Sequence, residues 1–273
     1  MIVLEGVTFS YDGGPPVLKD VDLSVGEGEY LGLAGPNGCG KTTLAMHLNG
    51  LLRPRAGTVT VDGLSVADPS SLRKIRALVG MVFQDPDSQI VGMTVEEDVA
   101  FGPLNLGLPP REVRRRLEES LEQVGIAHLR RRSPHTLSGG EKRLVAVAGV
   151  LAMRPRYIVF DEPAAFLDQA GRALVLGVMN RLHREGITIV HITHDLADLV
   201  AADRLVVMEA GTVTLQGPPP EVFGALMEGE GPLAPPPLAR LLWGLKRDGF
   251  PVRTDVLTVD GARLTIGALL GGR

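Results

Sequence analysis

Apolar and polar residues alternate over the N-terminal part of the chain. The stretches IVLEGVTFSY and VLKDVDLSV both alternate, the turn residues DGGPP lie between them, and EYLGLAG is a short apolar stretch that ends in glycine. A period of two is typical of half-buried β-strands. We therefore expect antiparallel β-structure at the start of the chain, followed by a buried strand.

Apolar residues then take up helical spacing. KTTLAMHLNGLL has this spacing, and SLRKIRALVGMVFQ is predicted to be a short helix and then a strand that ends at Gln84. From about Thr94 to Arg132 the strand-like patterns disappear, and VEEDVAFGPLNLG and PREVRRRLEESLEQVG are both helical in spacing. We expect a helical subdomain over about residues 94–153, inserted into the fold.

From residue 139 onward, helical and strand-like segments alternate again. The predicted elements are helix 139–153, strand 156–161, helix 169–185, strand 187–192, helix 195–202, strand 204–209 and strand 212–216. This alternation favours a mainly parallel sheet covered by helices. The predicted fold class is therefore α/β, with an antiparallel β part at its start.

The composition changes after Gly217. GPPPEVF and GEGPLAPPPLARLL are rich in proline and glycine, which indicates linkers around short helices. LARLLWGLKRDG is predicted to be an amphipathic helix, and VLTVDGARLTIGAL a β-hairpin that turns at Asp260-Gly261. We expect a main domain over residues 1–217 and a small C-terminal appendage over residues 218–273.

Composition and charge exclude several classes of function. The chain has 273 residues and a net charge of −4, without the basic excess of nucleic-acid binders, so no nucleic-acid partner is expected. Its one cysteine, Cys39, excludes an intramolecular disulfide. No signal-peptide pattern is evident, and the longest apolar run, LVAVAGVLAM, is shorter than the roughly 18 residues of a membrane span. The chain is not expected to be a membrane channel itself.

GPNGCGKT lies between a predicted strand and a predicted helix. Glycines at this spacing let backbone N–H groups turn inward around phosphate oxygens. Lys41 would reach the β- and γ-phosphates of a nucleotide, and the Thr42 hydroxyl would bind Mg²⁺. The alternative is a glycine turn that only tightens the strand–helix join, with Cys39 a small loop residue in either case. The candidate nucleotide-binding residues here are Gly35, Pro36, Asn37, Gly38, Cys39, Gly40, Lys41, Thr42 and Thr43.

Two carboxylates end the apolar strand YIVFDE, at Asp161 and Glu162. A strand that ends at the carboxyl edge of a parallel sheet places its last side chains at the ligand crevice. Asp161 would hold Mg²⁺, and Glu162 would polarise the water that attacks a phosphate. The alternative, two acids solvated at a strand end, is weakened by the phosphate loop upstream.

LSGGEK, a turn at the start of a predicted helix, completes the pattern. At this point the order and spacing of the motifs resemble the ATP-binding cassette family over residues 1–217. The residues that carry this resemblance are Lys41, Gln84, Ser138, Asp161, Glu162 and His194. The resemblance implies a P-loop NTPase cassette that hydrolyses ATP, with ATP and Mg²⁺ as its ligands.

The resemblance also implies a dimer of cassettes. In the family, two chains associate head to tail, and the signature turn of one caps the ATP bound by the other. Ser138, with the N–H groups of Gly139 and Gly140, would then hold the γ-phosphate of the partner's ATP. Ser138 would also suit a helix N-cap, which is compatible with this role. Asp168 matches the inter-subunit aspartate, and both a homodimer and a heterodimer with a related subunit remain open.

Three further residues receive roles from the resemblance. Gln84 would link Mg²⁺ and the attacking water to the docking surface, and His194 would contact the γ-phosphate and position the water. Tyr11 resembles the aromatic residue that stacks on adenine, or is an ordinary tyrosine at a strand end. His191 is interpreted as structural. The predicted catalytic residues are Glu162, His194 and Gln84, and the predicted Mg²⁺ ligands are Thr42, Gln84 and Asp161.

Two positions depart from the usual family pattern. Glu141 ends the signature where glutamine is usual, and Phe166 stands where a smaller residue is usual. We expect that neither change abolishes turnover, and that each alters the rate or the choice of partner.

The stretch FQDPDSQIVGMTVEEDVAFGPLNLGLP resembles a subgroup of the family, the energy-coupling factor importers of vitamins and of cobalt or nickel. This resemblance implies a groove for the coupling helices of a transmembrane subunit, and a membrane substrate-capture subunit in the same complex. It places the chain at the cytoplasmic face of the membrane as a peripheral subunit. The C-terminal appendage resembles the subgroup more loosely, and would help to hold the ATPase dimer together.

A soluble cassette ATPase that acts on a scaffold, as in iron–sulfur cluster assembly, is the main alternative. It would share every nucleotide motif, but it would not need the DPDSQI groove. A DNA-repair or chromosome-organising ATPase head would separate its motifs with long coiled coils, which this sequence does not have. A cassette translation factor would carry two cassettes in tandem.

Overall fold

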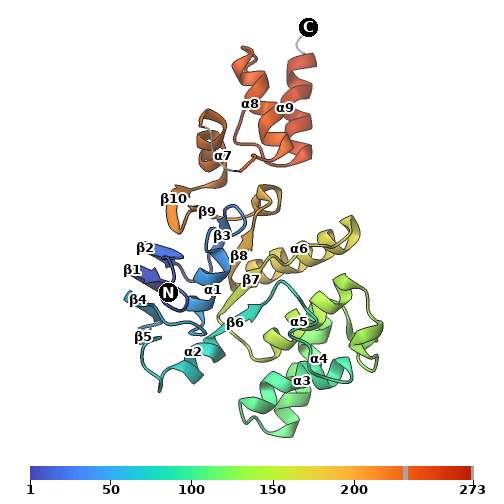
Figure 1. Cartoon of the computed structure of the whole chain (residues 1–273). Helices are drawn as coiled ribbons and strands as arrows, with labels where there is room; N and C mark the ends of the chain where they lie inside the picture. The colour runs from blue at the N-terminus through green and yellow to red at the C-terminus, as the bar shows by residue number, and fades with distance from the viewer. Residues whose placement is uncertain (230–232, 272–273) are drawn as a thin grey trace.

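The computed structural model describes residues 1–229 and 233–271, which form two β-sheets with helices packed around them (Figure 1). The smaller sheet is antiparallel, with the strand order β2-β1-β4-β5. Its strands are β1 Ile2–Phe9, β2 Leu18–Val25, β4 Ala56–Val61 and β5 Leu64–Ser65. The predicted antiparallel β part at the start of the chain is therefore confirmed.

The larger sheet has six strands in the order β10-β9-β3-β8-β7-β6. They are β3 Tyr30–Ala34, β6 Val79–Val82, β7 Tyr157–Asp161, β8 Thr188–Thr193, β9 Arg204–Glu209 and β10 Thr212–Gly217. All neighbours pair in parallel except β9 and β10. Every residue of β3, β7 and β8 is buried, as expected of strands covered on both faces. The α/β prediction is confirmed, and the carboxyl ends of β3, β7 and β8 meet at one edge.

Six helices precede the C-terminal part of the chain. They are α1 Lys41–Leu48, α2 Leu72–Leu78, α3 Val95–Asn105, α4 Pro110–Val124, α5 Gly139–Ala152 and α6 Gln169–Arg184. Short 3₁₀ turns lie at Ala127–Leu129, Pro134–Thr136 and Leu196–Leu199. Helices α3, α4 and α5 pack on one another beyond the β6 edge of the larger sheet (Figure 1).

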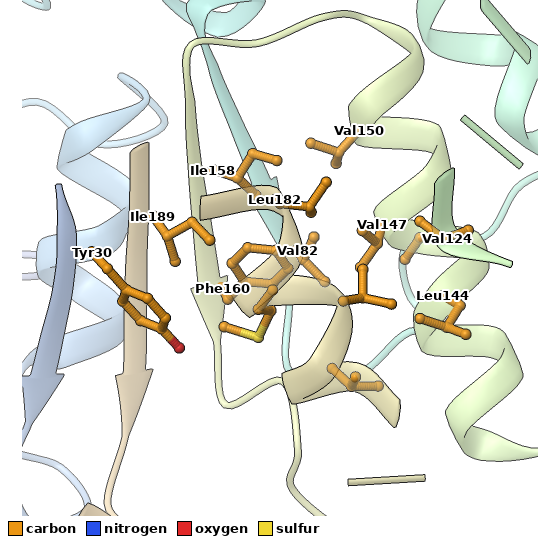
Figure 2. Packing of buried hydrophobic residues seen from close by; sticks show 14 of the residues in the cluster. Tyr30, Val82, Val124, Leu144, Val147, Val150, Ile158, Phe160, Leu182 and Ile189 are labelled. Carbon is orange, nitrogen blue, oxygen red and sulfur yellow. The ribbon is translucent and has the colours of Figure 1, made fainter. Parts of the chain in front are cut away.

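Helix α5 is fixed to the larger sheet by a buried apolar cluster. Figure 2 shows Ile158 and Phe160 of β7 together with Val147 and Val150 of α5 and Leu182 of α6, all members of one core cluster. Apolar side chains buried in this way each stabilise the fold by about 1.5–3 kcal/mol. This packing holds the Ser-Gly-Gly turn at the start of α5 in a fixed position relative to the strand that carries the two acids.

The C-terminal part contains α7 Pro219–Glu228, α8 Pro237–Arg247 and α9 Val259–Gly271. Val222 and Phe223 of α7 are buried in the same cluster as the larger sheet. Helix α8 approaches α7 closely, because a Cβ on Gly224 would lie 2.7 Å from the Trp243 ring. Helices α8 and α9 lie on the far side of α7 from the two sheets (Figure 1).

The predicted β-hairpin at Asp260-Gly261 is wrong, because these residues lie in the first turn of α9. The Thr258 hydroxyl accepts a hydrogen bond from the Gly261 N–H at 3.3 Å, which is the bond of a helix N-cap. Asp260 then places a negative charge beside the positive end of the helix dipole. These two local interactions favour a helix start over a tight turn.

Two further predictions differ from the structure by more than one residue. Strand β6 ends at Val82 instead of Gln84, since the backbone oxygens of Phe83 and Gln84 accept hydrogen bonds from the Arg143 side chain. The helix predicted at residues 195–202 is a single 3₁₀ turn, which the Asp195 carboxylate caps at the Ala197 N–H (2.9 Å). In the described residues, we find no helix whose length and apolar character would let it cross a bilayer.

Candidate functional site

The loop between β3 and α1 has a backbone that only glycine-rich sequences adopt easily. Gly38 and Gly40 have φ angles of 79° and 108°, in the left-handed region. A Cβ on Gly35 would lie 2.4 Å from the carbonyl oxygen of Met208 in β9. The loop can therefore pass close to the sheet and arrive at the N-terminus of α1, where backbone N–H groups favour anions.

The Lys41 side chain is buried and folds back over this loop. Its Nζ donates hydrogen bonds to the backbone oxygens of Gly35 and Pro36, at 2.7 and 3.0 Å. The ammonium is thus held where phosphate oxygens can replace the two carbonyls as acceptors. The Cys39 thiol is also buried, and burial raises its pKa, so it stays protonated and unreactive.

Asp161 ends β7 with a carboxyl group that is 2% exposed. Its Oδ1 has no hydrogen-bond partner in the part of the chain that the structure describes, and burial raises the pKa of the group. A buried oxygen left without a partner is unfavourable, and a cation would satisfy it. The neighbouring Thr42 hydroxyl acts in the opposite direction and lowers the pKa of the same carboxyl group. Together with the amide oxygen of Gln84, these are the hard oxygen ligands that suit Mg²⁺.

Glu162 and His194 form a pair at the adjoining strand ends. The pairing of β7 with β8 places Asp161 opposite Ile192, and His194 Nδ1 lies 2.9 Å from Glu162 Oε1. The Thr193 hydroxyl donates to the other carboxylate oxygen at 3.3 Å. A carboxylate held from two sides in this way is positioned to accept a proton from a water molecule.

A cleft of about 750 Å³ opens over these groups. The predicted residues that line it are Asn37, Gly38, Gly40, Lys41, Thr42, Thr43, Gln84, Glu162 and His194. The structure therefore brings the phosphate loop, the glutamine and the Glu162–His194 pair to one place. Among the described residues, the lining does not include Tyr11, Gly35, Pro36, Cys39, Ser138, Gly139, Gly140, Asp161 or Asp168.

Tyr11 lies just beyond β1 and is half exposed. Its hydroxyl lies 3.1 Å from Thr43 Oγ1, and its ring packs edge to face on Phe9, with the centroids 4.9 Å apart. These contacts attach the tyrosine to the first turn of α1, beside the phosphate loop.

The signature turn lies apart from this cleft. Ser138 is the N-cap of α5, and its hydroxyl accepts a hydrogen bond from the Glu141 N–H at 3.3 Å. The Glu141 carboxylate accepts in return from the Ser138 N–H and hydroxyl at 2.7 and 2.8 Å, and these bonds lower its pKa. Asp168 similarly caps α6 by accepting from the Gly171 N–H at 2.8 Å.

Two arginines that the sequence analysis missed hold the loops of the site. Arg143 of α5 is 2% exposed, and its Nη2 donates to the backbone oxygen of Gln84 at 2.6 Å. Arg172 of α6 donates to Asp198 at 2.8 Å and also to Asp195, the residue after His194. For Arg143, the only sequence feature that could have pointed to this role is a charge next to a long apolar helical run. For Arg172, no sequence feature points to its role.

The sequence pattern of the ABC transporter family matches residues 18–165. The chain is also 50% identical over 271 residues to the cobalt import ATP-binding protein CbiO of Syntrophus aciditrophicus, covering 98% of this chain and 96% of that protein. The chain belongs to the ATP-binding cassette transporter family. It is an ATPase of this family, with the P-loop NTPase fold, and ATP is its nucleotide.

Other relatives support the assignment of this protein to the ATP-binding cassette family. It is 52% identical to the energy-coupling factor transporter ATP-binding protein EcfA1 of Symbiobacterium thermophilum, over 95% of this chain and 94% of that one. The solved structure of cbiO1 from Clostridium perfringens, described as part of the complex cbiONQ, superposes with a TM-score of 0.78 at 35% identity, over 91% of this chain and 96% of that one. A dimeric bacterial cassette, MJ0796, gives a TM-score of 0.72 at 31% identity, over 80% and 98% of the two chains.

Proposed function

We propose that this ATPase powers an importer of the energy-coupling factor type, which takes up a transition-metal ion or a vitamin. The observation that carries the proposal is the 50% identity, over nearly the whole chain, to a protein named for cobalt import. The stretch DPDSQI, which a soluble scaffold-bound ATPase would not need, supports the same reading.

ATP hydrolysis at the cleft follows from the groups that line it. The phosphate loop and Lys41 hold the β- and γ-phosphates of ATP. Glu162 accepts a proton as a water oxygen attacks the γ-phosphorus, and the bond from this phosphorus to the ADP oxygen breaks. His194, paired with Glu162, fixes the position of that carboxylate and of the water. Thr42, Gln84 and Asp161 would hold Mg²⁺, which when bound neutralises charge on the phosphate oxygens.

The single chain leaves the cleft open on one side, and a second cassette subunit would complete it. In this arrangement Ser138, Gly139 and Gly140 of one chain contact the γ-phosphate on the other, and Asp168 lies at the interface. Tyr11 stacks on the adenine ring. The chain dimerises when ATP binds and separates after hydrolysis, and the C-terminal part strengthens the ATP-bound dimer.

A transmembrane coupling subunit would dock on the groove between α2, α3 and α5. This groove has a volume of about 770 Å³, and Leu72, Phe101 and Val150 contribute to its lining. Phe101 is 51% exposed there, and Leu104 of the same helix is 56% exposed. With a membrane substrate-capture subunit in the same complex, the ATPase is a peripheral protein at the cytoplasmic face of the membrane.

The catalytic part of the proposal is tested by Glu162→Gln. Without the carboxylate, kcat should fall about 100- to 1,000-fold, while the ATP-bound dimer accumulates and is seen by gel filtration. Glu228→Gln, an exposed change at the end of α7, serves as the control and should turn over normally. A Glu162→Gln chain that remains a monomer with ATP would contradict the mechanism.

The importer part is tested by a tagged pull-down from detergent-solubilised membranes, read by mass spectrometry. A multi-helix membrane subunit and a small capture protein should be recovered. Recovery from the soluble fraction alone, with a scaffold protein, would favour the iron–sulfur assembly alternative.

A further inference from the structure

The loop that joins β7 to α6 carries an aromatic side chain in an unfavourable setting. Phe166 is 94% exposed, and its φ angle of 62° lies in the left-handed region. Non-glycine residues there are strained, and such strain persists mainly at functional sites. Neither the exposure nor the backbone conformation of Phe166 stabilises the fold of the single chain.

Phe166 lies between two hollows of the same chain. It lines the nucleotide cleft together with Lys41, and it also lines a second hollow of about 560 Å³ together with Gly139. Phe166 therefore lies between residues of the phosphate loop and the signature turn.

This position has a consequence in the head-to-tail dimer, so the inference rests on the proposed function. In that dimer the cleft of each chain faces the signature turn of the other. A twofold axis that exchanges the two sites must pass between the cleft and the signature turn of each chain. A residue that lies between them lies near the axis, where side chains meet their own copies.

We propose that Phe166 packs against Phe166 of a second copy of this chain across the twofold axis, so that an aromatic pair closes the ATP-bound dimer. Two aromatic rings attract each other beyond the apolar area that they bury. The pair forms only where both subunits carry the aromatic residue. Phe166 therefore favours a homodimer over a heterodimer whose partner has a small residue at this position.

Phe166→Cys tests the proximity of the two rings. Cys39 is the one native cysteine and is buried, so a short bis-maleimide would react at the new thiol. In a Glu162→Gln background, ATP should give a cross-linked dimer, and its omission should abolish the product. Met93→Cys, 79% exposed beside α3, is the control and should give none.

The oligomeric state of the same samples, measured by sedimentation, separates the two hypotheses. An ATP-dependent dimer of the Phe166→Cys chain whose introduced thiols do not cross-link would overturn the pairing of Phe166 and leave the proposed function intact. A chain that stays monomeric with ATP would overturn both.

The energetic contribution of the ring is tested separately. Phe166→Ala should weaken ATP-dependent dimerisation by about fivefold in dissociation constant, which is the size expected for an aromatic pair. Phe166→Trp should restore it, because an aromatic partner is kept. An alanine variant that dimerises as tightly as the wild type would contradict the proposal.

Discussion

His191 lies in the middle of β8, with none of its surface exposed. Its Nδ1 lies 3.0 Å from the Tyr30 hydroxyl oxygen of β3, and its Nε2 has no hydrogen-bond partner among the residues that the structure describes. Burial, aided by the positive charge of Arg172, lowers the pKa of His191 to about 3. The imidazole is therefore neutral in the folded protein at neutral pH, as expected of a structural histidine.

His191 should make the fold sensitive to acid. Below the ordinary histidine pKa of about 6.5, the unfolded chain binds a proton that the folded chain does not bind, so stability is lost as pH falls from 6.5 toward 3. At pH 5 this loss is about 2 kcal/mol. In His191→Phe, the drop in unfolding free energy between pH 7 and pH 5 should shrink by about this amount, as measured by urea denaturation.

Asp198 acts in the opposite direction, since burial raises its pKa to about 6 and its protonation favours the folded state as pH falls from 6 to 4. This contribution is common to the wild type and the variant, and cancels in the comparison. His135→Phe, at an exposed position, is the control and should leave the drop unchanged. An equal drop in wild type and His191→Phe would refute the assignment.

The residues of the site were predictable where their chemistry depends on spacing along the chain. Lys41 follows its glycines directly, and Glu162 follows the last residue of β7, so spacing along the chain predicts both as site residues. Arg143 could not, because its acceptors are the Phe83 and Gln84 carbonyls, far away in the chain. These two carbonyls need a side-chain donor only because β6 ends before them. The pattern of apolar and polar residues does not predict where that strand ends.

At the scale of elements, the start of α5 combines a helix cap with the turn proposed to bind the partner's γ-phosphate. The Glu141 carboxylate accepts a hydrogen bond from the Ser138 hydroxyl, with 2.8 Å between the two oxygens. The Ser138 hydroxyl is therefore already used as a donor to Glu141. The carboxylate also places a negative charge where a phosphate would bind. The usual glutamine would cap the same helix without the charge.

Glu141→Gln should therefore strengthen ATP-dependent dimerisation. In a Glu162→Gln background, the ATP concentration for half-maximal dimerisation should fall about threefold, a modest effect because exposed charges are screened. Light scattering measures it, and the shift should shrink at high salt. Glu122→Gln, exposed on α4, is the matched control. Weaker dimerisation of Glu141→Gln would show that the carboxylate itself supports the interface.

Helix α6 is joined to the His194 loop by Arg172. One guanidinium binds both Asp195 and Asp198, so a movement of the Asp168 end of α6 is transmitted to the residue next to His194. Arg172→Ala should reduce kcat about tenfold and leave the KM for ATP nearly unchanged, because the nucleotide-binding loop is untouched.

Lysine at position 172 should recover only part of this loss, since it cannot form the forked pair of bonds. Arg181→Ala changes an exposed arginine of the same helix and should behave as wild type. If Arg172→Ala instead raised KM with kcat intact, the arginine would be a nucleotide contact and not a positioning residue.

The elements with a buried face were predictable, and α9 was not. Val259 and Leu264 of α9 are 76% and 72% exposed, so the apolar residues of this helix do not mark a single buried face. Without a helical period in its apolar residues, the segment was predicted to be a hairpin from its Asp-Gly pair. The Thr258 cap that decides for a helix is a single hydrogen bond, and the same residue type also occurs in strands.

At the scale of the whole molecule, the C-terminal residues divide into two kinds. Val222 and Phe223 of α7 complete the core beneath the larger sheet. Ala239 of α8 belongs to the same cluster, while Leu241 of α8 and Val259 of α9 are 50% and 76% exposed. This distribution favours a structural role for α7 and the buried side of α8, and a contact role for the exposed side of α8 and for α9 in the dimer.

Two truncations separate these roles. A chain of residues 1–228 keeps the buried side chains of α7 and loses Ala239 of α8 from the core, so it should fold with reduced stability and bind ATP, but its ATP-bound dimer should be weaker. A chain of residues 1–217 loses Val222 and Phe223, whose burial contributes several kcal/mol in total, and should unfold at much lower urea concentration. Sedimentation and urea denaturation measure the two effects. Equal dimerisation of the full chain and residues 1–228 would leave α8 and α9 without a part in the dimer, and the ATP-bound interface would then depend on the cassette face around Phe166 alone.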